Sequence, residues 1–201
     1  MSPLLRVLWS ALAVVGASLL LGGLTSWAQD VLPSALASFA NSPSGWTALT
    51  ALLVAATRPS PVTGAVLGVV SFVALVLGYT VACELRGLAY DPVLWSVVGL
   101  IAGPFVGVAA AAVVGPRAIQ AALGAGALAG VLVADGIYGL TVVSSSTSPV
   151  YWTLCLVAGA ALVAGTVTRF RTPAAAVGVV ASAAAATAVL SLGYGVLNGV
   201  S

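Results

Sequence analysis

Asp135 is the side chain whose type and position most strongly suggest a chemical role. It follows the apolar run Leu132-Val-Ala134 and precedes Gly136-Ile137, so its surroundings are apolar on both sides. A charged side chain at membrane depth costs about 2.5–3.5 kcal/mol on insertion scales and therefore needs a compensating role. Tyr138 lies three residues further on, where its hydroxyl can share a helical face with the carboxylate. Two interpretations stay open: a ligand, cation or proton site that opens outward, or an internal hydrogen-bonded anchor.

Three other residues are candidates for the mouth of such a site. Glu84 follows one apolar stretch, and Trp27 and Trp95 lie near the ends of two others. Carboxylates and aromatic rings together attract cationic or planar apolar ligands. The alternative is that Glu84, with Asp30 and Asp91, only supplies the few charges that solvate the connections between helices.

The usual catalytic constellations are missing from the sequence. It has no His, and all six of its basic residues are arginines, which excludes histidine acid–base chemistry and histidine metal sites. We predict no cofactor and no metal site, and with a net charge of +2 we find no basic patch for nucleic acid. An enzyme would have to use isolated carboxylates and tyrosines, for example as a cyclase or isomerase with Asp135 or Glu84 as general acid.

The composition places these residues in a membrane. Of the 201 residues 61% are hydrophobic and only 5% are charged, and the mean hydropathy is +1.20. A soluble domain carries roughly 25% charged residues, because its surface must face water. We therefore predict an all-α, polytopic transmembrane helix bundle that forms a single integral membrane domain over residues 1–201.

Seven apolar segments, separated by Pro, Ser, Asn and Arg, fill nearly the whole chain. They cover residues 4–26, 45–57, 62–83, 93–114, 118–140, 150–168 and 174–197. The second segment is short for a full crossing, so six spans remain an alternative to seven.

The arginines favour seven spans with the N-terminus inside and the C-terminus outside. In that topology the inner connections carry five arginines and the outer ones carry only Arg86, as the positive-inside rule requires. The inner arginines are Arg6, Arg58, Arg117, Arg169 and Arg171. Without a crossing by the second segment, Arg58 would lie outside with Asp30, and Arg6 would lie opposite the later arginines.

The aromatic residues agree with this topology, because most of them fall near outer helix ends. Four of the five tryptophans do so (Trp27, Trp46, Trp95 and Trp152), as do all five tyrosines. Ser26-Trp-Ala28 resembles a signal-peptide cleavage site, but the preceding apolar run is longer than a signal core, so we favour a retained first helix. Residues 31–40 are compatible with a short helix at the outer interface.

Small residues at four-residue spacing predict close helix packing. Gly99, Gly103 and Gly107 form one such stripe, and the fifth segment has Ala122, Gly126, Gly130 and Ala134 in the same register. We expect the fourth and fifth segments to pack on each other through these stripes. Cys83 and Cys155 both lie near outer ends, where either a disulfide or two buried thiols are compatible with the sequence.

Two resemblances accompany these patterns. The residues Leu24–Pro33, Ala40–Trp46, Ala102–Gly107 and Asp135–Gly139 resemble an uncharacterised family of bacterial multi-span membrane proteins, which implies the bacterial cytoplasmic (inner) membrane. Gly103-Pro-Phe-Val-Gly107, with the chain length and the small-residue helices, is similar to the substrate-binding subunits of energy-coupling-factor vitamin importers. That similarity implies a ligand bound toward the outer face, although those subunits have six spans with both termini inside.

Three functional hypotheses follow. The first is a small-molecule-binding membrane protein, a transport component whose outer-leaflet pocket for a small lipophilic or cationic ligand uses Asp135, Tyr138, Glu84, Trp27 and Trp95. The second is the membrane enzyme described above, acting on a lipophilic substrate. The third is a scaffold whose glycine stripes bind the helices of a partner membrane protein.

Overall fold

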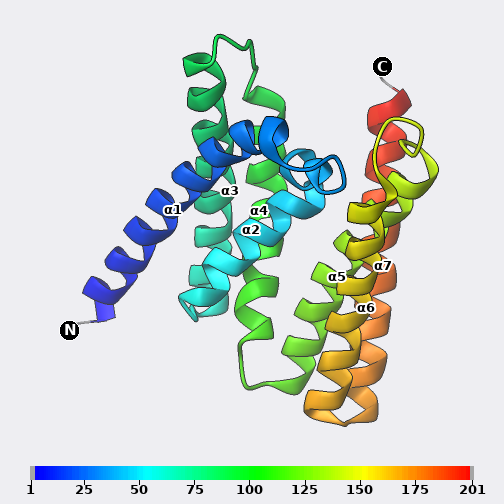
Figure 1. The fold of residues 1–201 in the computed structure, drawn as a ribbon. Coiled ribbons are helices and arrows are strands. Elements are labelled where there is room, and N and C mark those ends of the chain that lie inside the picture. Colours follow the sequence, from blue (N-terminus) through cyan, green and yellow to red (C-terminus); the bar gives the residue numbers. More distant parts are fainter. Residues whose placement is uncertain (1–2, 200–201) are drawn as a thin grey trace. The chain divides into compact units, whose positions relative to one another are not determined.

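The computed structural model describes residues 3–199, which form seven α-helices and one 3-10 helix without a strand (Figure 1). The elements are α1 (Pro3–Val31), η1 (Ala37–Asn41), α2 (Pro43–Ala56), α3 (Pro61–Leu85), α4 (Val93–Val113), α5 (Ala118–Thr141), α6 (Pro149–Phe170) and α7 (Pro173–Gly199). Six of these helices are long and apolar enough to cross a membrane, whereas α2 has only 14 residues. The prediction of an all-α protein with several spanning helices is confirmed.

Proline and serine set most of the helix starts. Five helices begin at a proline, whose fixed φ and missing N–H suit the first helical position. Ser60 and Ser148 precede α3 and α6, and the side chain of each accepts a hydrogen bond from a backbone N–H in the first turn. The helix ends therefore fall within a few residues of the predicted ones, with α1 extending furthest beyond its prediction. The side chain of Arg6, an inner arginine in the predicted topology, lies outside the described part of the structure.

The chain forms two compact units. Unit 1 contains the residues up to Val31 and Trp46–Ala111, and unit 2 contains Leu32–Gly45 and the residues from Ala112 onward. The single membrane domain over residues 1–201 stays a prediction.

In unit 1, α1 and α3 run parallel and pack closely. Ser18 Oγ lies 2.9 Å from Ser71 Oγ, and further along both helices Ser26 Oγ lies 3.4 Å from Cys83 Sγ. A Cβ atom on Gly78 would overlap the carbonyl group of Leu19, so this approach requires glycine. Figure 1 shows both helices rising from the same end of the unit.

The glycine stripe of α4 packs against α3, which runs antiparallel to it. A Cβ on Gly107 would overlap the Gly64 carbonyl, and Gly103 faces Val69 in the same way. The prediction that the stripes of the fourth and fifth segments pack on each other is therefore wrong, because α3 already covers the stripe of α4. A stripe of small residues allows another helix to approach closely. Which helix takes that place depends on which one also has small residues facing the stripe.

In unit 2, the stripe of α5 packs against α7, and these two helices also run parallel. A Cβ on Gly126 would overlap the Val179 carbonyl oxygen, and one on Gly130 would lie 2.6 Å from the Cβ of Ala186. The hydroxyl of Ser182 donates to the Leu123 carbonyl at 2.7 Å. Helix α6 packs antiparallel on α5, where Gly139 accommodates the ring of Trp152.

The connection from α1 to α2 is mostly irregular and partly buried. The short helix expected over residues 31–40 appears as η1 (Ala37–Asn41), and its Ala40 is fully buried. Trp46, one turn into α2, lies against Phe72 and Tyr79 of α3, with ring centroids 6.1 Å and 5.6 Å apart. Because residues 57–60 then lead directly into the start of α3, α2 runs antiparallel to α3 and begins level with its middle.

Candidate functional site

Asp135 is at the centre of a buried hydrogen-bond network in unit 2. It lies in the last third of α5 and is only 1% exposed. Its Oδ2 accepts a hydrogen bond from the backbone N–H of Ser44 at 2.8 Å, and its Oδ1 accepts one from the hydroxyl of Tyr194 on α7. Both carboxylate oxygens are thus occupied within the chain.

The N–H of Ser44 belongs to the first turn of α2, so Asp135 acts on a helix N-terminus. The first N–H groups of a helix have no partner inside it, and they attract negative charge. Ser42 Oγ satisfies a second of these groups by accepting from the Gly45 N–H at 3.1 Å. Two of the N–H groups at the buried start of α2 are therefore capped, one by Asp135 and the other by Ser42.

Residues of α6 extend this network. The hydroxyl of Tyr151 lies 2.9 Å from Ser42 Oγ and 2.7 Å from Ser44 Oγ, and Cys155 Sγ lies 3.6 Å from Ser44 Oγ. All four of these side chains are buried. Both Cys155 and Cys83 are free thiols.

Tyr138 does not stand alone beside Asp135, because its ring stacks on that of Tyr194. The two ring centroids are 4.0 Å apart and the planes differ by 11°. Both tyrosines line a cavity of about 290 Å³ between α5 and α7. Its other lining residues are Ala134, Ile137, Thr141, Val142, Ser191 and Gly195. Asp135 lies behind the Tyr194 hydroxyl and is not itself a lining residue.

From the sequence, Tyr194 is only one of five tyrosines predicted near outer helix ends. Tyr194 and Asp135 are 59 positions apart in the sequence, and no local motif connects them. The available signal was indirect: small residues on α5 and α7, such as Gly130 and Ala186, allow the parallel approach that brings both residues together.

The other predicted site residues lie in unit 1. The Arg86 guanidinium stacks over the ring of Trp27 at 4.9 Å from its centroid and forms an ion pair with Asp30. Trp95 packs against the core formed by Trp46, Phe72, Leu75 and Val76. Glu84 is exposed at the end of α3. The structure thus places Tyr138 at the cavity, with Asp135 reaching it only through the Tyr194 hydroxyl, and Trp27, Glu84 and Trp95 are not among the residues that line it.

An aromatic cluster covers the end of unit 1 at which α1 and α3 finish. The rings of Tyr79 and Tyr90 meet edge to face at 4.7 Å, and Gln29 Nε2 donates to the Tyr79 hydroxyl at 2.8 Å. Tyr90 lies in the connection between α3 and α4, and burial raises its pKa to about 12. The hydroxyl of Tyr90 is therefore neutral at physiological pH.

The long apolar helices and the buried polar network define an α-helical, multi-span membrane protein. More particularly, the chain belongs to a family of unknown function (DUF6518), whose family model matches residues 1–200. The predicted kinship with an uncharacterised family is confirmed, whereas the similarity to energy-coupling-factor importers stays a prediction. No curated protein and no solved structure matches the chain.

Proposed function

We propose that this protein binds a small molecule in the bacterial cytoplasmic membrane and acts as a component of a transport system. The observation that carries the proposal is the hydrogen bond between Asp135 and Tyr194. Through this bond the buried Asp135 carboxylate contacts the hydroxyl of a tyrosine that lines a cavity. The ring of Tyr138, which also lines the cavity, stacks on the ring of that tyrosine. Charged groups buried at membrane depth characteristically mark substrate or ion pathways.

The topology that we propose has seven crossings, with the N-terminus inside and the C-terminus outside. Helices α1 and α3 are parallel, so the chain between them must return across the membrane if both helices cross it. The connections at 86–92, 114–117, 142–148 and 171–172 have at most seven residues, which reach about 25 Å when extended. That is less than the roughly 30 Å hydrocarbon core, so each of these connections stays on one side.

The crossing that returns the chain from the end of α1 to the start of α3 would consist of α2 and the irregular segment before it. The 14 residues of α2 span about 21 Å at 1.5 Å per residue, too short for the core alone. Irregular backbone at membrane depth is tolerated where protein buries it and satisfies its polar groups. Asp135 and Ser42 perform this task at the start of α2. Interrupted helices whose ends point into the protein are also a recurring feature of transporter binding sites.

In this topology the cavity opens toward the outer leaflet, because Tyr138 and Tyr194 lie in the last turns of two helices that run outward. Its lining is aromatic and aliphatic, with the hydroxyls of Thr141 and Ser191 as polar groups. Such a lining suits a small ligand with a planar apolar part or a cationic group. Glu84, Trp27 and Trp95 remain proposed ligand-binding residues on the same outer face.

Binding is favoured over acid catalysis because the Asp135 carboxylate does not line the cavity and has both oxygens occupied. A general acid must reach its substrate directly or through one water molecule. The scaffold hypothesis has less support, since α3 and α7 of the same chain already cover the glycine stripes.

Native mass spectrometry of the gently purified, full-length protein tests the proposal. We expect a fraction of the protein to carry one additional small-molecule mass that dissociates on collisional activation. A chain that is always free of small molecules, from several expression conditions and mild detergents, would contradict the proposal. In that outcome Asp135 is explained as a structural anchor of α2.

A further inference from the structure

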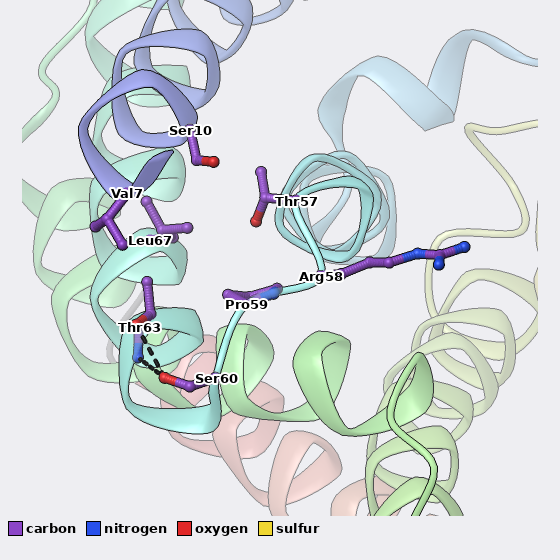
Figure 2. A pocket seen from close by; sticks show the side chains of 8 residues that line it. All are labelled: Val7, Ser10, Thr57, Arg58, Pro59, Ser60, Thr63 and Leu67. Carbon is purple, nitrogen blue, oxygen red and sulfur yellow. Dashed lines mark hydrogen bonds between the residues drawn. The ribbon is translucent and has the colours of Figure 1, made fainter. Parts of the chain in front are cut away.

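Unit 1 contains a second cavity, at the end opposite to its aromatic cluster. It has a volume of about 380 Å³, within the usual range of roughly 300–1,000 Å³ for small-molecule sites. Its walls come from the start of α1, the connection 57–60 and the first turns of α3 (Figure 2). The lining residues are Val7, Ser10, Thr57, Arg58, Pro59, Ser60, Thr63 and Leu67.

The cavity lies toward the starts of α1 and α3, before the point where Ser18 Oγ meets Ser71 Oγ. Below that point Val7 and Ser10 face the end of α2 across a gap, which Figure 2 shows between Ser10 and Thr57. The opening therefore lies between the start of α1 and the end of α2.

The hydroxyl groups of this cavity retain unused hydrogen-bonding capacity. Ser60 Oγ and Thr63 Oγ1 are 2.9 Å apart, so only one of their two protons is used in that bond. The described part of the chain contains no hydrogen bond to Ser10 Oγ. At least two hydroxyl donors are thus available beside the apolar side chains of Val7 and Leu67.

Arg58 adds a positive charge at the rim. Its backbone has a φ of 47°, which holds the residue at the tip of the connection, and its exposed side chain points away from the centre of the cavity (Figure 2). Within the described residues no acidic group pairs with it. The described acids of unit 1 lie far from this cavity along the helices: Asp30 and Glu84 in the last turns of α1 and α3, and Asp91 in the connection after α3.

We propose that this cavity binds the phosphate headgroup of an anionic phospholipid. The free hydroxyls of Ser10 and the Ser60–Thr63 pair would donate to the phosphate oxygens, and the exposed Arg58 side chain would turn from its orientation in Figure 2 to pair with the phosphate at the rim. The acyl chains would lie on the apolar surface of α1, where Leu8 and Leu12 are exposed. A phospholipid fits better than a free anion because the apolar side chains of Val7, Pro59 and Leu67 line the cavity beside its hydroxyls, and because Leu8 and Leu12 of the adjoining α1 are exposed. Basic pockets between helices on the cytoplasmic side are a recognised site for such headgroups.

The proposal rests on the topology given above only for the leaflet, which would be the inner one. The binding chemistry itself does not depend on Asp135, on Tyr194 or on the outer cavity. The two proposals can therefore fail separately.

The test is native mass spectrometry of the full-length protein with equal amounts of phosphatidylglycerol and phosphatidylcholine. We expect one phosphatidylglycerol to be retained in preference to phosphatidylcholine. Arg58→Gln removes one charge-assisted contact and should lower the affinity of the protein for phosphatidylglycerol about tenfold. Ser10→Leu fills the cavity without changing the charge and should remove the bound lipid, while both variants keep the wild-type melting temperature.

Arg117→Gln is the matched control, because it removes one exposed arginine from the connection between α4 and α5, and Arg117 is not a lining residue of this cavity. It should leave lipid retention unchanged. Equal retention of both lipids, or unchanged phosphatidylglycerol in Arg58→Gln and Ser10→Leu, would overturn the proposal. Displacement of the lipid by millimolar inorganic phosphate would also overturn it, since the site would then be one for small anions.

Discussion

The Asp135 carboxylate accepts two hydrogen bonds of different kinds, one from a backbone N–H of α2 and one from the Tyr194 hydroxyl. The first bond supports the start of a helix, and the second reaches the wall of the cavity between α5 and α7. The proximity of Asp135 to Tyr138 on one helix could be anticipated from their spacing in the sequence. The contact with Tyr194 could not, because it depends on how α5 and α7 pack.

Asp135→Asn separates the two roles of this residue. Its carboxamide oxygen can still accept from the Ser44 N–H, so we expect the fold to persist. The loss of charge weakens a hydrogen bond of the charged type, worth about 1.5–3 kcal/mol, and we expect ligand occupancy to fall about tenfold. Occupancy is measured by native mass spectrometry and folding by thermal melting in detergent.

Tyr194→Phe is the companion variant, since it removes the hydroxyl that donates to Asp135 but keeps the stacked ring and the negative charge. It should also lose ligand while remaining folded. If Asp135→Asn fails to fold and Tyr194→Phe binds normally, Asp135 is an anchor for α2 and the binding role assigned to it is wrong.

Tyr90 gives a prediction about pH. Burial raises its folded-state pKa to about 12, compared with about 10 in an unfolded chain. The folded state thus favours the protonated phenol, and this contribution to stability is complete below pH 10 and is lost as the pH rises from 10 toward 12.

Absorbance at 295 nm during a pH titration should therefore show a late-titrating tyrosine that disappears in Tyr90→Phe. The alkaline decrease in melting temperature between pH 10 and pH 12 should also be smaller in this variant. A Tyr90 that titrates near pH 10 in the folded protein would contradict the described burial.

At the scale of elements, the helix ends could be read from the sequence and the helix partners could not. Prolines such as Pro61 and Pro149, together with Ser60 and Ser148, mark boundaries through local chemistry that acts in any context. The stripe Gly99–Gly103–Gly107 predicts a close approach correctly, but its partner is α3 and not the fifth segment. Choosing the partner requires knowing which other helix also has small residues at the same depth.

Gly78 and Gly16 form a matched pair for testing the packing of α1 on α3. Gly78→Ala would push a Cβ into the backbone of Leu19, so we expect a loss of about 1–3 kcal/mol in the free energy of unfolding. Gly16→Ala meets nothing within 4 Å and should be neutral, or stabilising by up to about 1 kcal/mol through helix propensity.

Denaturant or thermal unfolding in a mild detergent measures both glycine variants. Equal stability of the two would show that α1 and α3 do not approach as closely as described here.

At the scale of the whole molecule, the parallel orientation of α1 and α3 supports the proposed seven crossings over six. With seven crossings, the connection 57–60 lies inside and the connection 86–92 lies outside. With six crossings and the same N-terminus, these two locations are exchanged. The arginine distribution already favoured seven crossings, but the short second segment left the choice open at the sequence level.

Single cysteines in cells test this topology with a membrane-impermeant maleimide. We expect labelling of Leu88→Cys and Ser146→Cys, and protection of Ser60→Cys until the cells are opened. The native Cys83 and Cys155 are buried, so the unmodified protein is the unlabelled control. Labelling of Ser60→Cys in intact cells, with protection of Leu88→Cys, would contradict the proposed topology.

The central claim is that the cavity beside Tyr138 and Tyr194 holds a small molecule. Ser191 lines that cavity and is exposed, so Ser191→Leu fills the space without changing Asp135 or either tyrosine. The most direct measurement is native mass spectrometry of the wild type beside Ser191→Leu, purified in parallel. We predict a small-molecule mass on the wild type that is absent from an equally stable Ser191→Leu. An equal bound mass on both proteins, or none on the wild type, would contradict the claim.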